Sequence, residues 1–283
     1  MNVHRFTGSP DTVPVNAYLV ETPDAVVAVD ATLTVSSGRG LRARAAEIGK
    51  PLVGVLITHA HPDHYGGLVE LLQGDDVPVY ATAGVAHTIR RDDEVKEAIL
   101  RPMLGDEWPL ERRFPNRTAA DRERLELGGA QFTVIDLGPG ESPHDSIWLL
   151  GSGEEGVFAG DQAYNAMHAY LADGFHETWL THIELLRREL PANATLYIGH
   201  GEPGGLELLD RQELYIQTFV AAARDADWSD RERAKAEVIE TMARFLPTED
   251  LRFLMELSVE PLAASAVPAR RRRPGRRTRP ACC

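Results

Sequence analysis

Short apolar segments alternate with turn residues over the first two hundred residues of the chain. Residues 16–20 alternate between the two faces of a strand, whereas 25–30 and 52–57 are continuous apolar runs, typical of strands covered on both faces. Turn-prone sequences such as Thr22-Pro23-Asp24 separate these runs. We predict strands over residues 16–20, 25–30, 52–57, 77–81, 132–137, 147–150, 156–159 and 195–198.

Helical spacing appears between these strands and dominates the C-terminal part. Leu41, Ala45 and Ile48 recur at helical intervals in a segment that Ser36 or Ser37 would cap. Further helices are predicted from residue 68, over 177–190, and through most of 206–260. Residues 82–121 are irregular and charged, which predicts an irregular insertion over an active site.

The alternation of strands and helices predicts an α/β fold, and 283 residues suffice for one large domain. We expect a catalytic domain over residues 1–205 and a helical C-terminal extension of the same domain over 206–268. Residues 269–283 are low in complexity and rich in arginine, which predicts a disordered tail.

Composition restricts the chemistry. The only cysteines are Cys282 and Cys283, so any metal must be bound by histidine and carboxylate side chains. No stretch approaches the roughly 20 apolar residues of a membrane span, and residues 1–10 lack the apolar core of a signal peptide. We therefore expect a cytoplasmic protein that does not bind membranes.

Charge argues against a nucleic-acid partner. The formal net charge is −13, and the last fourteen residues contain seven arginines, which leaves −20 for residues 1–269. A body this acidic repels nucleic acid, so we expect a small-molecule substrate.

The candidate chemistry lies in a histidine-rich loop directly after the buried segment 52–57. His59, His61, Asp63 and His64 fall within six residues. In an extended turn, His59 and His61 point the same way and can chelate one ion, while Asp63 and His64 face a second. Imidazole and carboxylate together suit Zn²⁺, Fe²⁺ or Mn²⁺. Gly66 and Gly67 then permit a tight entry into the next helix.

This loop resembles the HxHxDH motif of the metallo-β-lactamase superfamily, position for position. The resemblance extends from about residue 16 to 205, through Asp30, Gly138-Pro139-Gly140, Gly160-Asp161 and Gly199-His200-Gly201. It implies an αββα sandwich of the metallo-β-lactamase type with two divalent metal ions, zinc first, with iron or manganese as alternatives. By the same likeness, Asp161 is the bridging carboxylate and His200 is the last ligand of the second ion.

One position departs from the family pattern. Where most members have a histidine, this chain has Glu141, and His144 follows three residues later. Either Glu141 is the third ligand of the first ion, as in alkylsulfatase-type members, or a reshaped loop brings in His144. The Gly138-Pro139-Gly140 run fixes the register and favours Glu141, which leaves the other residue as a supporting partner or substrate contact.

The resemblance also implies roles in catalysis. With two metals, a bridging hydroxide is the nucleophile, and Asp63 is both a ligand and a proton acceptor. Tyr164 lies three residues after Asp161, the spacing at which lactonase-like members place an oxyanion-stabilising tyrosine, although packing at a strand end explains it equally well. Asn165 and His168 follow the same strand and are candidates for lining the substrate pocket, unless they belong to a solvated helix face.

We therefore predict a metal-dependent hydrolase that cleaves a small ester-like bond such as a lactone or thioester. The alternatives are sulfate-ester or β-lactam hydrolysis at the same site, or an iron-dependent oxygenase of the same fold. Leu251, Phe253, Leu254 and Met255 are apolar enough to dock beside the pocket or to form a homodimer contact.

Overall fold

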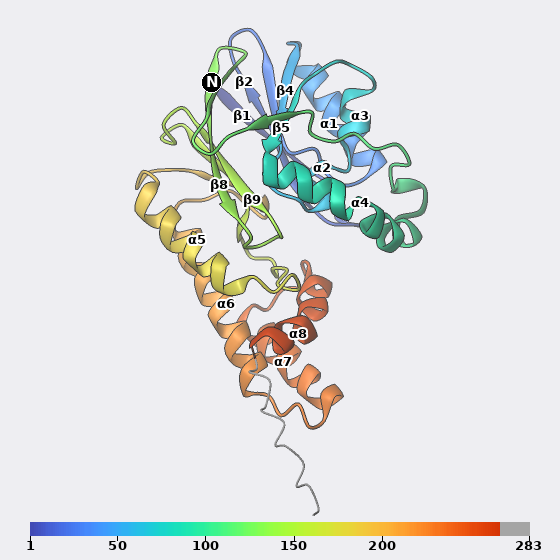
Figure 1. The fold of residues 1–283 in the computed structure, drawn as a ribbon, viewed down its shortest axis with the longest axis vertical. Helices are drawn as coiled ribbons and strands as arrows, with labels where there is room; N and C mark the ends of the chain where they lie inside the picture. The colour runs from blue at the N-terminus through green and yellow to red at the C-terminus, as the bar shows by residue number, and fades with distance from the viewer. Residues whose placement is uncertain (267–283) are drawn as a thin grey trace, which may run out of the picture.

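Two β-sheets pack face to face between two layers of helices in the computed structural model, which describes residues 1–266 (Figure 1). This arrangement confirms the predicted αββα architecture with helices at its C-terminal end. The predicted arginine-rich tail, residues 269–283, lies outside the described residues.

The first sheet contains six strands in sequence order. β1, β2 and β3 pair antiparallel, and β3 to β6 pair parallel. Parallel strands end at the same edge, so the loop after β4 and the loop after β3 lie side by side. The bounds are β1 (Asn2–Thr7), β2 (Asn16–Glu21), β3 (Val26–Val29), β4 (Leu52–Leu56), β5 (Val79–Thr82) and β6 (Arg117–Ala119).

The second sheet has the order β11-β10-β9-β8-β7, antiparallel except for the parallel pair β10 and β11. Its inner face packs on the first sheet through an apolar core that includes Val27, Leu56, Phe132, Trp148 and Phe158. The alternation of residues along each strand supplies this core from both sheets. The bounds are β7 (Arg124–Leu127), β8 (Ala130–Gly138), β9 (Asp145–Leu150), β10 (Gly156–Tyr164) and β11 (Leu196–His200).

Helices cover the outer face of each sheet. None of the helices within residues 1–266 has the length and apolarity that a membrane crossing requires. The first sheet is covered by α1 (Val35–Ile48), α2 (Pro62–Tyr65), α3 (Leu68–Leu72) and α4 (Ala83–Leu104), with the 3-10 turn η1 (Gly105–Glu107) after α4. The second sheet is covered by α5 (His176–Glu189) and α6 (Glu207–Asp225), and α7 (Arg231–Phe245) and α8 (Arg252–Ala266) pack against α6.

The prediction of an irregular insertion over residues 82–121 was wrong, because most of this stretch forms the helix α4. The Thr82 side chain accepts a hydrogen bond from the Val85 amide and caps the helix, and Val85 and Ile89 are buried against the first sheet. The second half of α4 extends beyond the sheet, and its many charged residues masked the helical spacing of its few apolar ones in the sequence. The strands β1, β6 and β7 were also missed, because they are short or largely exposed.

Two further local details differ from the predictions. Thr34, not Ser36 or Ser37, caps α1, with its hydroxyl accepting from the Ser37 amide. The histidine-rich loop already contains the helix α2, which begins at Pro62, a residue suited to a first helical position.

The segment proposed for docking or dimerisation belongs to α8 and the residue before it. Leu251 and Met255 are buried with α6 in the core of the second sheet. Phe253 and Leu254 instead line a cavity described below. The helical extension therefore packs on the same core as β10 and β11 and reaches the site.

Candidate metal centre

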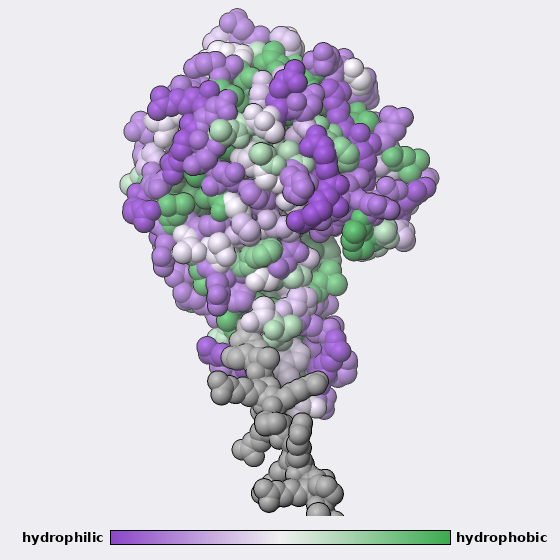
Figure 2. All heavy atoms as spheres, viewed as in Figure 1, coloured by the Kyte–Doolittle hydropathy of each residue, from purple (hydrophilic) through white to green (hydrophobic). Residues whose placement is uncertain are grey.

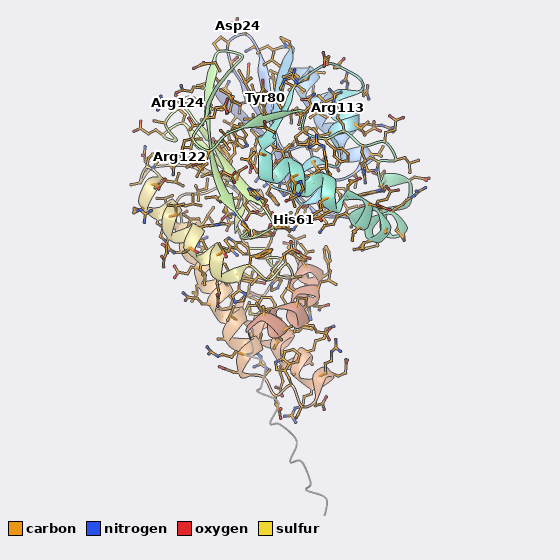
Figure 3. The ribbon with its side chains drawn as sticks, viewed as in Figure 1. Asp24, His61, Tyr80, Arg113, Arg122 and Arg124 are labelled. Atoms are coloured by element: carbon orange, nitrogen blue, oxygen red, sulfur yellow. The ribbon has the colours of Figure 1, made fainter. Side chains whose placement is uncertain are left out.

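Seven side chains from strand ends of both sheets converge at one edge of the sandwich. The loop and helix after β4 supply four of them, and the β8–β9 loop, β10 and β11 supply one each. Figure 3 shows His61 at the lower edge of the sheets, where the helical extension begins. We call this group the metal cluster; it consists of His59, His61, Asp63, His64, Glu141, Asp161 and His200.

One half of the metal cluster surrounds Glu141. Its Oε2 lies 2.9 Å from His61 Nδ1 and 3.5 Å from His59 Nε2. Asp161 Oδ2 lies 3.9 Å from the same nitrogen of His59. His59, His61, Glu141 and Asp161 each offer one ligand atom within 4.8 Å of the others, a spacing at which they could hold one ion.

The other half surrounds Asp63 and the opposite side of Asp161. Asp161 Oδ1 lies 3.3 Å from His64 Nε2, and Asp161 Oδ2 lies 3.1 Å from His200 Nε2. Asp63 Oδ2 lies 3.3 Å from His200 Nε2 and 3.7 Å from His64 Nε2. These four residues form a second group of ligand spacing, and Asp161 belongs to both groups.

The outward nitrogen of each cluster histidine has a hydrogen-bond partner. Asp30 Oδ2 accepts from His64 Nδ1 at 2.8 Å, and Asp173 Oδ2 accepts from His61 Nε2 at 3.0 Å. The Pro14 carbonyl accepts from His200 Nδ1 at 3.0 Å. Such bonds fix the ring orientation and leave the inward nitrogen able to bind a metal ion once it gives up its proton.

His59 is oriented in the same way through Thr58. The Thr58 hydroxyl donates its proton to Asp30 Oδ2 at 2.8 Å, so the 3.0 Å contact with His59 Nδ1 must be donated by the histidine. Asp30 also accepts from the Thr58 amide at 2.9 Å. Asp30 adopts φ of 60°, a strained backbone conformation that this hydrogen bonding offsets.

A test of metal fit comes from buried atoms without a hydrogen-bond partner in the described residues. His59 Nε2, His64 Nε2, Glu141 Oε2 and Asp161 Oδ1 are all such atoms, because the ion-pair contacts between them given above do not have hydrogen-bond geometry. Buried polar groups left unpaired cost about 1–3 kcal/mol each. Divalent cations would satisfy all four at once, so these residues fit metal ions.

The carboxylates of the metal cluster hold protons on most of its histidines. Burial opposes a charge on His61, but Glu141 and Asp173 together outweigh it and raise the pKa of His61 well above its ordinary value. In the same way, Asp161 and Asp63 overcome burial and raise the pKa of His200 to about 10. For His59, burial and the charge of His64 lower the pKa. A cation that replaces these protons meets the same negative field.

Glycines make room for this packing. A Cβ on Gly199 would overlap the Asp161 carboxylate, and one on Gly67 would overlap the Ala31 carbonyl. Gly66 and Gly67 have ordinary negative φ values, so space and not backbone freedom requires them. The two glycines let the loop after β3 pack closely against the start of α3, where the sequence predicted a tight entry into a helix.

Tyr164 touches both halves of the metal cluster. Its hydroxyl lies 2.8 Å from Asp161 Oδ2 and 3.0 Å from Glu141 Oε1, and the ring stacks on His200 with centroids 5.0 Å apart. One hydroxyl proton serves two carboxylate acceptors. Together with burial, these anions raise the pKa of Tyr164 well above its ordinary value, so the phenol keeps its proton.

Three predicted site residues lie elsewhere, which corrects the sequence-based assignment. His144 Nε2 contacts Asp136 Oδ1 at 2.7 Å, outside both groups of ligand spacing, because the β8–β9 loop directs Glu141 inward instead. Asn165 donates to the Glu202 carbonyl at 2.9 Å. His168 is buried beneath α6, with Nδ1 3.0 Å from the Tyr215 hydroxyl.

Supporting residues to which the sequence assigned no role are Asp30, which was noted only as part of the family resemblance, and Asp173 and Asp145, which were not noted at all. Asp145 Oδ2 accepts from the Glu141 amide at 2.6 Å and from Gln162 Nε2 at 3.0 Å, which fixes the loop that carries Glu141. Burial raises the pKa of Asp145 to about 6. Asp30 ends a predicted strand, which was a usable signal; Asp145 and Asp173 carried none.

A cavity of about 200 Å³ opens onto the metal cluster. Its inner end contains His61, Asp63, Asp161, His200 and Tyr164. Its remaining walls come from the N-terminal loops, α4, the segment before α5, and α8. The residues are Val13, Leu33, Pro62, Lys96, Ile99, Leu100, Met103, Tyr170, Phe253, Leu254 and Leu257.

The strand-end ligands, the shared aspartate and the αββα layers agree with a known family. The family model described as "Metallo-beta-lactamase superfamily" matches residues 10–200, and the chain belongs to this superfamily. Hydroxyacylglutathione hydrolase from Prochlorococcus marinus is 27% identical over 156 residues, which cover 54% of this chain and 53% of that protein. The chain spans between 30% and 53% of the lengths of the first curated relatives it matches.

Solved structures give the same fold. A metallo-β-lactamase family protein from Thermus thermophilus aligns with a TM-score of 0.67 at 21% identity, over 93% of this chain and 92% of that one. The protein TTHA1623, described in a di-iron-bound form, aligns with a TM-score of 0.59 at 27% identity, over 74% of this chain and 98% of that one.

Proposed function

We propose that this chain is a metal-dependent hydrolase that cleaves a small ester-like bond, with thioesters and lactones as the leading substrates. The main support for this proposal is the pair of ligand groups that share Asp161 at the inner end of a cavity. The similarity to hydroxyacylglutathione hydrolase supports a thioester. Hydrolysis breaks the acyl C–S or C–O bond, and water supplies the oxygen of the new carboxylate.

We propose two divalent ions per chain, one held by His59, His61 and Glu141, the other by Asp63, His64 and His200, with Asp161 between them. When bound, such ions supply Lewis acidity and water of lowered pKa. Glu141 adds a negative charge to the first group and makes Mn²⁺ or Fe²⁺ more competitive with Zn²⁺. The di-iron form of TTHA1623 supports iron as a candidate beside zinc.

The side chains around the cavity then have separate roles. Asp63 lines the cavity with its Oδ2 3.3 Å from His200 Nε2, which places a carboxylate where it can take up a proton from water. Tyr164 keeps its phenol proton and directs it toward the space between Asp161 and Glu141, where it can donate to negative charge on a substrate oxygen.

The experiment compares metal content with activity on one substrate panel. Protein loaded with Zn²⁺, Mn²⁺ or Fe²⁺ is assayed on hydroxyacyl thioesters, lactones, aryl esters, aryl sulfates and a chromogenic β-lactam, with elemental analysis of each sample. We expect ester and thioester turnover that a chelator abolishes and added metal restores. Turnover of none of these substrates by fully loaded protein would refute the proposal.

A second candidate, sulfate-ester hydrolysis, is favoured by one observation, the placement of Glu141 in the metal cluster. Aryl sulfate turnover that exceeds aryl ester turnover in the same panel would select it. Oxygen consumption by iron-loaded protein without hydrolysis would instead select an oxygenase.

A further inference from the structure

The cavity walls beyond the metal cluster are almost entirely apolar. Ile99, Leu100 and Met103 from α4 and Phe253, Leu254 and Leu257 from α8 line it, and we call these six residues the groove. Residues 96, 99, 100 and 103 recur at the spacing of one helix face, so α4 presents a continuous stripe to the cavity. Figure 2 shows hydrophobic surface on both sides of the recess between the upper body and the helical extension.

Several groove side chains are exposed although they are large and apolar. Ile99 is 56% exposed and Leu257 is 59% exposed, on opposite walls of the same cavity. Contiguous exposed apolar surface beside a polar centre marks a binding site more often than isolated exposed residues do. The groove and the metal cluster line the same cavity, so a substrate bound at the metal cluster would extend along the groove.

The charge of the groove wall indicates a neutral occupant. Among the described residues, Lys96 is the one charged side chain that lines the cavity outside the metal cluster. Its positive charge already acts on the nearby carboxylates of Asp92 and Asp173, where it contributes to their lowered pKa. The wall therefore offers little to a strongly anionic group, such as the two carboxylates of a glutathione thioester, and much to an alkyl chain.

We propose, resting on the hydrolase function above, that the groove binds the neutral alkyl chain of the substrate between α4 and α8. The substrate is then an ester or thioester with a medium or long alkyl chain, and its reacting bond lies at the metal cluster. Each methylene that enters the groove multiplies kcat/KM by as much as about fourfold, the factor that corresponds to about 0.8 kcal/mol.

The first experiment measures kcat/KM of the metal-loaded protein on p-nitrophenyl esters with acyl chains of increasing length, and on acetates of alcohols of increasing length. We expect a rise of about twofold to fourfold per methylene in one series until the groove is filled. The Leu257→Asn and Ile99→Asn variants flatten that rise. The matched control Leu214→Asn, at a 54% exposed position on α6 that does not line the cavity, keeps it.

The second experiment measures binding of the neutral fluorescent probe N-phenyl-1-naphthylamine, with and without metal. We expect binding that decanol displaces and ethanol does not, weakened about fivefold or more by Leu257→Asn and unchanged by Leu214→Asn. This arm separates the two proposals, because probe binding without turnover of any ester would refute the hydrolase and leave the groove supported. Turnover that is independent of both chain lengths would refute the groove and leave the hydrolase intact.

A third outcome assigns the groove to another occupant. Light scattering coupled to gel filtration gives the oligomeric state of wild type and Leu257→Asn. A wild-type dimer that Leu257→Asn converts to a monomer, together with flat chain-length series, would make the groove a contact between two copies and overturn the alkyl-chain assignment.

Discussion

The metal cluster and the groove share one cavity, yet their side chains differ in burial and in bonding. Cluster residues such as His59 and Glu141 are buried, and each is oriented by a hydrogen bond to another buried residue. Groove residues such as Ile99 and Leu257 are exposed and make contacts only through apolar surface. In the proposed function, the chemistry would depend on this hydrogen-bonded network, whereas the selection of substrate would depend on side chains that can change at little cost to folding.

The strongest contrast comes from His61→Ala. The change removes a ligand from the first group, and we expect activity to fall by about three to four orders of magnitude with loss of one metal per chain. Elemental analysis and initial rates measure both effects. His87→Ala, an exposed histidine on α4, is the control and keeps both. Full activity and metal content in His61→Ala would reject the site.

Glu141→Gln against His144→Ala tests which residue of the β8–β9 loop is the ligand. Gln keeps the shape of Glu141 and removes its charge, so we expect first-group metal affinity and activity to fall about a hundredfold or more. His144→Ala should change neither the metal affinity nor the activity by more than about twofold. Titration with a competing chelator gives the affinities, and the opposite ranking would transfer the ligand role to His144.

Tyr164→Phe separates catalysis from metal binding. The ring and its stacking on His200 remain, but the donor between Asp161 and Glu141 is lost. We expect kcat to fall about tenfold to a hundredfold, with KM and metal content nearly unchanged. Steady-state kinetics and elemental analysis on the same sample give the answer. A change in KM alone would make Tyr164 a binding residue instead.

The smallest effect concerns stability and pH. The pKa of His200 is raised to about 10 in the folded chain without metal, above its ordinary value near 6.5. Its stabilising charge is thus fully present below pH 6.5 and is lost as pH rises toward 10. Bound metal replaces that proton, so we expect metal to stabilise the fold by about 2 kcal/mol more at pH 9 than at pH 6.

Thermal unfolding with and without chelator at the two pH values measures this difference. Leu257→Asn provides the contrast, because a groove residue contributes no charge and its variant should show the same pH-dependent gain as wild type. A metal-induced shift in Tm that is equal at pH 6 and pH 9 would contradict the prediction that bound metal replaces the proton of His200.

The sequence by itself determined the layered α/β fold and most of the metal cluster. Periodicity located the strands because buried apolar runs and turn residues are local signals. The HxHxDH loop located four ligands because they are adjacent in the chain. Asp161 and His200 followed from the resemblance to the metallo-β-lactamase superfamily, and the register of the Gly138-Pro139-Gly140 run favoured Glu141.

Only the tertiary structure decided what surrounds these ligands. Asp30 and Asp173 orient cluster histidines that lie 34 and 112 positions away in sequence, and no local pattern encodes such pairings. Asn165 and His168 were misassigned to the pocket because following a strand does not fix where a side chain points. The groove likewise forms only when α4 and α8, separated by most of the chain, meet across the cavity, since solvent exposure and apolar contact are properties of the folded surface.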